Sequence, residues 1–132
     1  MIVDSSAVLA IALAEPDARR FAEAIADAPR PRISAANWFE ASMVIDRRGD
    51  DIARQRLEDL WRETGVEIVP FTAEHALRAR TAWRIYGKGN KQGGTLNFGD
   101  CMAYGCAMTE GEPLLFKGND FPQTDVTPAL KA

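Results

Sequence analysis

Met1-Ile2-Val3-Asp4-Ser5-Ser6-Ala7-Val8 is the stretch that indicates the fold class of this chain. Its first three residues form an apolar run typical of a short buried strand, and Asp4 ends that run. An almost wholly apolar stretch, 7–14, follows and predicts a buried helix, for which Ser5 or Ser6 would be the N-cap. A buried strand that leads directly into a buried helix is typical of α/β proteins with parallel sheets.

The rest of the chain repeats this alternation. Helix spacing with start or stop signals predicts further helices after Pro16, over 35–48, from 50 or 51 to 64, from 72 to 86 and from 97 to about 109. Strands are predicted at 33–34, 66–71 and 114–116, with a final edge strand starting at 125–126. We therefore expect one domain, 1–132, with a three-layer α/β fold in which helices flank a central, mainly parallel sheet of four to five strands.

Composition narrows the possible functions. No apolar run reaches the roughly 18 residues that a membrane helix needs, and no basic segment precedes the first apolar stretch, so we expect a cytoplasmic protein without a membrane partner. The net charge is −3, whereas a protein that binds nucleic acid by charge alone would be basic. Any contact with nucleic acid must therefore be local or use a bound cation.

The cysteines and the histidine offer little chemistry. Cys101 and Cys106 lie five residues apart on one predicted helix, too far apart for a disulfide, so we expect reduced core residues. His75 is the only histidine and lies at a polar helix start, where we expect a surface position.

Four carboxylates are the strongest functional signal: Asp4, Glu40, Asp100 and Asp120. Each follows a predicted strand or lies near the start of a helix, and ligands of parallel sheets bind at the carboxyl ends of the strands. We expect the Glu40 side chain to point inward, because its helix neighbours Met43 and Val44 are apolar.

Each acid also has an ordinary structural interpretation. Asp4 could cap the next helix, Asp100 could form a capping box with Asn97, Glu40 could pair with a buried arginine, and Asp120 could form a turn. Together, however, four converging acids would repel one another unless a cation lay between them. Carboxylate ligands without histidine or cysteine favour Mg²⁺ or Mn²⁺, which can polarise a phosphodiester and activate water.

A glycine-rich segment, 87–94, predicts a mobile loop. Its pattern does not fit a phosphate-cradling nucleotide loop. Lys88 and Lys91 could contact the phosphates of a nucleic acid beside the acids, or the segment could be an ordinary solvated loop.

Four segments that carry the acids and the glycine loop resemble PIN-domain ribonucleases, specifically the VapC toxins of VapBC toxin–antitoxin modules. The resemblance covers Ile2 to Val8, Ser34 to Ala41, Tyr86 to Gly89 with Leu96 to Tyr104, and Leu114 to Phe121 with Thr124 to Val126. It implies a Mg²⁺-dependent endoribonuclease of a type II toxin–antitoxin system, which cuts RNA and slows translation. It also implies a homodimer and an inhibitory VapB-like antitoxin.

The resemblance assigns roles to the acids. Asp4 and Asp100 would be the metal ligands, with Glu40 as a further acid and Ser6 in a supporting role. Many PIN sequences place the fourth acid where this chain has Gly118, so Asp120 or Asn119 would have to replace it. The competing hypothesis is a catalytically weak PIN-like module that acts by binding RNA or an antitoxin. Large aromatics on the helices, including Trp38, Phe39, Trp61 and Trp83, could contribute to a partner groove.

Overall fold

The computed structural model describes residues 1–131 and contains a parallel four-stranded sheet in the order β3-β2-β1-β4. Its strands are β1 (Ile2–Val3), β2 (Arg32–Ser34), β3 (Glu67–Val69) and β4 (Leu114–Leu115). The helices are α1 (Ser5–Ala12), α2 (Ala18–Asp27), α3 (Ala35–Arg48), α4 (Asp51–Thr64), α5 (Ala73–Tyr86) and α6 (Phe98–Glu110). The predicted α/β fold with a central parallel sheet is confirmed.

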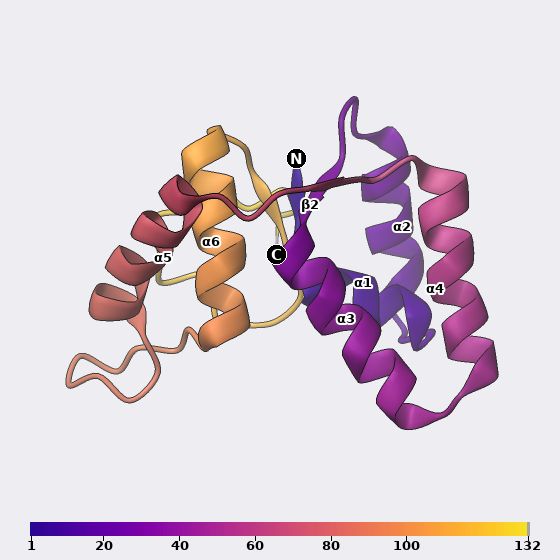
Figure 1. The fold of residues 1–132 in the computed structure, drawn as a ribbon, viewed down its shortest axis with the longest axis horizontal. Coiled ribbons are helices and arrows are strands. Elements are labelled where there is room, and N and C mark those ends of the chain that lie inside the picture. The colour runs from indigo at the N-terminus through magenta and orange to yellow at the C-terminus, as the bar shows by residue number, and fades with distance from the viewer. Residues whose placement is uncertain (132) are drawn as a thin grey trace.

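Helices cover both faces of the sheet, which gives three layers (Figure 1). On one face, Val3, Ile33 and Leu115 pack against α1 to α4. On the other face, Ile2 and Leu114 pack against α5 and α6. Neighbouring residues of one strand thus face opposite cores, as the two-residue period of a strand requires.

Local capping signals define most helix ends. The side chains of Ser34, Asp50, Thr72 and Asn97 each accept a hydrogen bond from a backbone N–H in the first turn of α3, α4, α5 and α6. Gly49 ends α3 with a φ of +66°, a left-handed conformation that glycine adopts without strain. These starts and stops agree with the sequence predictions.

Four local predictions were wrong. Asp4, not Ser5 or Ser6, caps α1, because its carboxylate accepts a hydrogen bond from the Ser6 N–H, which confirms the alternative interpretation of Asp4 as a cap. The strand predicted over 66–71 shortens to β3, and residues 125–126 form no strand. His75 is buried rather than exposed, since the α5–α6 contact encloses it.

The predicted domain also includes residue 132, which lies outside the described residues.

The two cysteines are free and buried, as expected. Within residues 1–131, no helix is long and apolar enough to cross a membrane.

Candidate functional site

Asp4 lies at the carboxyl end of β1, at the edge of the sheet where α1 begins. Its backbone N–H donates to the Leu115 carbonyl at 2.8 Å, and its Oδ2 accepts from the Ser6 N–H at 3.0 Å. Oδ1 is buried and has no hydrogen-bond partner within residues 1–131. Burial, with smaller contributions from the charges of Asp100 and Glu40, raises the pKa of Asp4 to about 7. Helix capping therefore accounts for only one of its two carboxylate oxygens.

Asp100 occupies the first turn of α6 and forms a capping box with Asn97. The Asp100 N–H donates to Asn97 Oδ1 at 2.9 Å, while Asp100 Oδ2 accepts from the Asn97 N–H at 3.0 Å. Burial, followed by the charges of Asp120 and Glu40, raises the pKa of Asp100 to about 6 despite that hydrogen bond. The capping interpretation is correct, yet it does not neutralise the carboxylate.

Glu40 reaches the same region from α3. Its Oε1 accepts hydrogen bonds from Ser5 Oγ at 2.5 Å and from Asn37 Nδ2 at 3.4 Å. Asn37 Nδ2 also donates to the Gly99 carbonyl at 3.0 Å. A Cβ at Gly99 would lie 2.0 Å from Glu40 Oε2, so only glycine lets the carboxylate pack against the start of α6.

The reason given for the direction of Glu40 was wrong. Met43 and Val44 are largely exposed, together with Phe39, so the apolar stripe beside Glu40 faces solvent. Polar contacts with Ser5 and Asn37 position the carboxylate, and no arginine pairs with it in the part of the chain that the structure describes.

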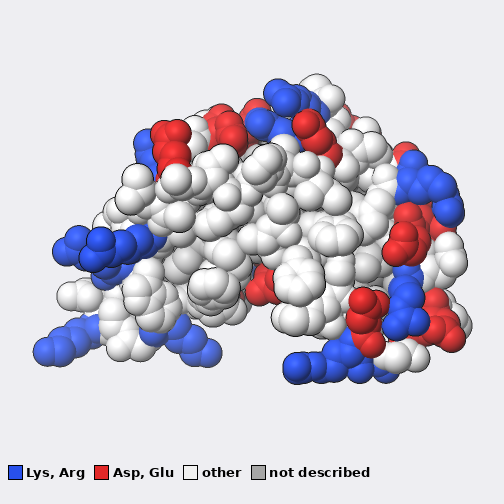
Figure 2. All heavy atoms as spheres, viewed as in Figure 1, with Lys and Arg blue, Asp and Glu red and all other residues white. Residues whose placement is uncertain are grey.

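The acids come from different elements: Asp4 ends β1, Glu40 lies on α3 and Asp100 lies in the first turn of α6, and their charges act on one another's pKa values. Figure 2 shows an acidic patch at the head of a notch between the lobe of α3 and α4 and the lobe of α5 and α6, with basic side chains farther out on both sides. Among residues 1–131, no three carboxylate, imidazole or thiol groups form a complete metal-binding cluster. Asp4 and Asp100 nevertheless fit a hard divalent cation, because an unpartnered buried carboxylate oxygen lies beside a second buried acid.

A family model matches this chain over residues 1–126, and it is the model of the PIN domain. The chain belongs to the PIN-domain family. Similar curated proteins extend this result: Ribonuclease VapC28 of Mycobacterium tuberculosis is 42% identical over 98% of this chain and 98% of its own length. Ribonuclease VapC36 of the same species is 46% identical and covers 96% of this chain and 91% of its own length.

Two solved structures share the PIN fold. The VapC20 toxin of Mycobacterium tuberculosis, described as cleaving the sarcin–ricin loop, superimposes with a TM-score of 0.72 at 18% identity, over 96% of this chain and 95% of that one. A toxin–antitoxin complex from Klebsiella pneumoniae gives a TM-score of 0.70 at 16% identity, over 99% of this chain and 98% of that one. At these identities the likeness establishes the fold alone.

The fourth acidic position of this PIN domain lies in the loop after β4. Asp120 is exposed, its charge raises the pKa of Asp100, and its carbonyl accepts a hydrogen bond from Thr95 Oγ1. Asn119 is also exposed. Gly118 has a φ of +104°, a conformation in which an aspartate would be strained. The loop geometry thus accounts for glycine at a position where many PIN sequences place an acid.

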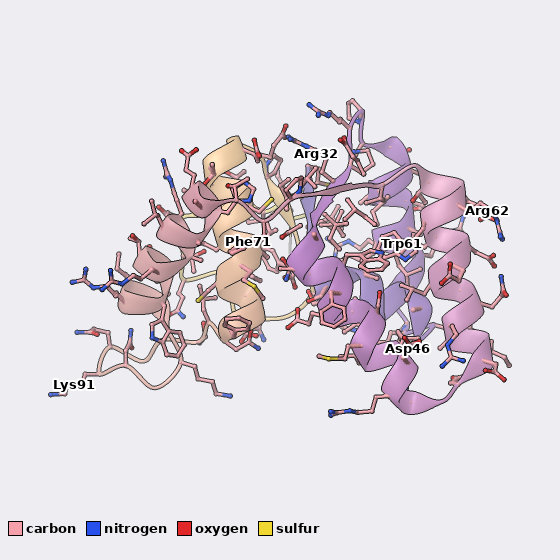
Figure 3. All side chains as sticks on the ribbon, viewed as in Figure 1. Arg32, Asp46, Trp61, Arg62, Phe71 and Lys91 are labelled. Carbon is pink, nitrogen blue, oxygen red and sulfur yellow. The ribbon has the colours of Figure 1, made fainter. Side chains whose placement is uncertain are left out.

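The polar candidates near this PIN centre have different surroundings. Ser6 Oγ accepts from the Lys117 N–H at 2.9 Å, which joins α1 to the loop after β4. The Lys117 ammonium pairs with Glu15 and Asp17, so it is occupied by carboxylates. Lys88 and Lys91 are exposed on the glycine loop, and Figure 3 shows Lys91 projecting from that loop.

Sequence analysis missed the residues that hold Glu40 in place. Ser5, Asn37 and Gly99 each lie within five residues of a predicted acid. Asn37 had a usable signal, because it precedes Glu40 by three residues and shares its helix face. Ser5 and Gly99 had none, because their contacts with α3 depend on tertiary packing.

Proposed function

We propose that this chain is a VapC-type endoribonuclease, the toxin of a toxin–antitoxin pair, which hydrolyses RNA phosphodiester bonds in a reaction that depends on Mg²⁺ or Mn²⁺. The observation that carries the proposal is the buried, unpartnered Oδ1 of Asp4 beside the buried acid Asp100. Burying a negative charge without a partner is costly, and a bound cation would remove that cost. Support also comes from the ribonuclease names of relatives that are 42–46% identical.

Asp4 and Asp100 would hold the cation. When bound, the metal would polarise a phosphoryl oxygen and activate the water that attacks phosphorus. Asp4 is fixed by its cap to α1 and Asp100 by its capping box, so neither carboxylate needs to reorganise to bind the ion. This fixed geometry favours reaction because orientation is established before the substrate arrives.

Glu40 would accept a hydrogen bond or a proton from the attacking water. Ser5 and Asn37 hold one of its oxygens, and the position of Gly99 brings the carboxylate against the first turn of α6. Asp120 would bind a second ion or orient water from the exposed side, with Asn119 as the alternative neutral ligand. Lys88 and Lys91 would contact phosphates of the RNA.

The same proposal includes two protein partners and one compartment. A VapB-like antitoxin would inhibit the enzyme by covering the acids. A second copy of the chain would pack on the exposed apolar face of α3, where Phe39, Met43 and Val44 lose contact with water on association. Residues 1–132 would act as one PIN domain in the cytoplasm.

The decisive experiment compares wild type with Asp4→Asn on purified total RNA, with Mg²⁺ and with EDTA. We expect only one of the four reactions to show cleavage: wild type with Mg²⁺. Equal cleavage by Asp4→Asn, or cleavage that persists in EDTA, would contradict the proposal. Absence of cleavage with retained RNA or antitoxin binding would favour the competing hypothesis of a catalytically weak binding module.

A further inference from the structure

An apolar groove of about 600 Å³ lies between α5, the glycine loop and the first turn of α6. Two aromatic side chains in its lining are unusually open to solvent: Phe98 is 78% exposed and Trp83 is 49% exposed. The Trp83 ring packs against Gly87, where a Cβ would lie 2.6 Å from a ring carbon. The ring thus lies against the backbone at Gly87, while about half of Trp83 remains exposed on the groove.

Two cations share this lining with the aromatic residues. Arg80 and Lys88 are exposed, and neither has a carboxylate within 4 Å in residues 1–131. In Figure 2, basic side chains project from the lobe that α5 and the glycine loop form, although the chain as a whole has a net charge of −3. The groove is therefore complementary to an anion with apolar faces.

The groove adjoins Asp100 through Asn97. Asn97 and Phe98 belong to its lining, and Asn97 exchanges two hydrogen bonds with Asp100. A ligand in the groove would therefore lie beside the first turn of α6, next to the acid that we propose as a metal ligand.

We propose that this groove holds an unpaired segment of RNA, with bases stacked on Phe98 and Trp83 and phosphates contacting Arg80 and Lys88. Aromatic faces beside cations are the usual means of binding single strands, because every base has a π face. A duplex hides those faces, so the groove selects unpaired RNA. This inference rests on the proposed ribonuclease function and specifies the form of its substrate.

The test measures binding in EDTA, where no cleavage is expected. The probe is a fluorescein-labelled 12-nucleotide RNA of mixed sequence, which is about the length that spans a small single-strand site. The protein is titrated against this RNA as a single strand and as a blunt duplex. Wild type should bind the single strand at least about tenfold more tightly than the duplex. Phe98→Ala should weaken single-strand binding about tenfold, and Phe98→Tyr should retain it, because stacking needs the ring.

Matched controls come from the same helix. Leu77 is 69% exposed on α5 and Arg78 is also exposed, yet both line a different pocket. Leu77→Ala should therefore bind RNA as wild type does. Arg80→Gln should reduce the slope of log Kd against log salt by about 1, whereas Arg78→Gln should leave it unchanged.

A spectroscopic measurement gives a second readout. A base stacked on Trp83 should quench part of the tryptophan fluorescence. Trp83→Phe should abolish that quenching while RNA still binds, since a ring remains for stacking. Trp38 and Trp61 contact each other in the other lobe and should not respond.

Each remaining outcome has a defined meaning. Equal binding of duplex and single strand, or unchanged RNA binding by both Phe98→Ala and Arg80→Gln, would overturn the proposal. A change of oligomeric state in Phe98→Ala with unchanged RNA binding would show a protein interface instead. Phe98-dependent binding without cleavage in Mg²⁺ would contradict the ribonuclease function alone, whereas cleavage that is indifferent to groove variants would contradict only the groove.

Discussion

The two ends of the parallel sheet differ in how their charges are compensated. At the amino ends of the strands, buried Arg32 pairs with Glu112 at 3.0 Å and with Glu110 at 3.8 Å. The N-terminal ammonium of Met1 also contacts Glu112 at 3.0 Å, and His75 contacts Glu110 at 3.2 Å. Hydrogen bonding to the ammonium, helped by Arg32, lowers the pKa of Glu112.

At the carboxyl ends, Asp4 and Asp100 are both buried, neither forms an ion pair within residues 1–131, and their pKa values rise, although the charge of Lys88 partly opposes the rise at Asp100. Figure 3 shows Arg32 near the top of the view, with Lys91 and Asp46 at the lower left and lower right. The difference teaches that the same fold can satisfy its buried charges, so the unpaired acids at the carboxyl ends are the place where we propose a functional site.

The largest effect is expected when an acid is removed at the carboxyl ends of the strands, where Asp4 and Asp100 lie. Asp100→Asn should lower the cleavage rate by about 10³-fold or more, because the centre loses a ligand charge. The same variant should melt at a higher temperature than wild type in EDTA, and added Mg²⁺ should no longer raise its melting temperature. Four identical melting curves would show that the acids do not interact.

The pH dependence of stability should also differ between the two ends. The folded pKa of Asp4, about 7, exceeds its ordinary value of 3.8, so the folded state binds more protons in this range. Asp4 should therefore lower the free energy of unfolding of the metal-free protein by about 3–4 kcal/mol as the pH rises from 4 to 7, and the raised pKa of Asp100 should add to that fall. Urea titrations across this range measure the change. Asp4→Asn should remove the larger part of the fall and leave the part that comes from Asp100.

Removing the ion pairs of Arg32 at the amino ends of the strands should lower the stability of the fold but not the rate of RNA cleavage. Arg32→Met removes the cation that Glu110 and Glu112 share. Because both carboxylates are partly exposed and keep His75 or the Met1 ammonium as a partner, the free energy of unfolding should fall by about 1–2 kcal/mol. Specific cleavage activity of the folded fraction should stay unchanged. Arg54→Met, which removes exposed pairs with Asp46 and Asp51, is the control and should scarcely alter stability.

Gly99 offers a way to displace Glu40 without changing any acid. Gly99→Ala places a methyl group where the Glu40 carboxylate lies and should reduce cleavage about 10²-fold, or about 2.7 kcal/mol. Glu40→Ala removes the clash, so adding Gly99→Ala to it should cause no further loss. Independent effects in this double-mutant cycle would argue against displacement of Glu40.

The smallest effect is expected at Asp120, which is exposed in the loop after β4. Asp120→Asn should reduce cleavage by less than about tenfold, because solvent and the phosphates of RNA screen an exposed carboxylate. A loss as large as that of Asp100→Asn, measured on the same RNA, would make Asp120 a full member of the centre.

Local signals made much of this structure predictable. Caps at Ser34, Thr72 and Asn97 and the stop at Gly49 depend on residues within one helical turn, so the helices could be placed from the sequence. The strand at 66–71 was predicted too long, because pairing with β2 determines how much of the segment is strand.

The sequence by itself determined the order of elements and the parallel sheet, because spacing and capping are local properties, and it predicted which acids form the site. Only tertiary structure decided how those acids are held. Ser5 meets Glu40 across 35 residues, and Asn37 meets the Gly99 carbonyl across 62. Tertiary structure also decided that His75 is buried and that the apolar side chains beside Glu40 on α3 are exposed, since burial depends on which helices pack together.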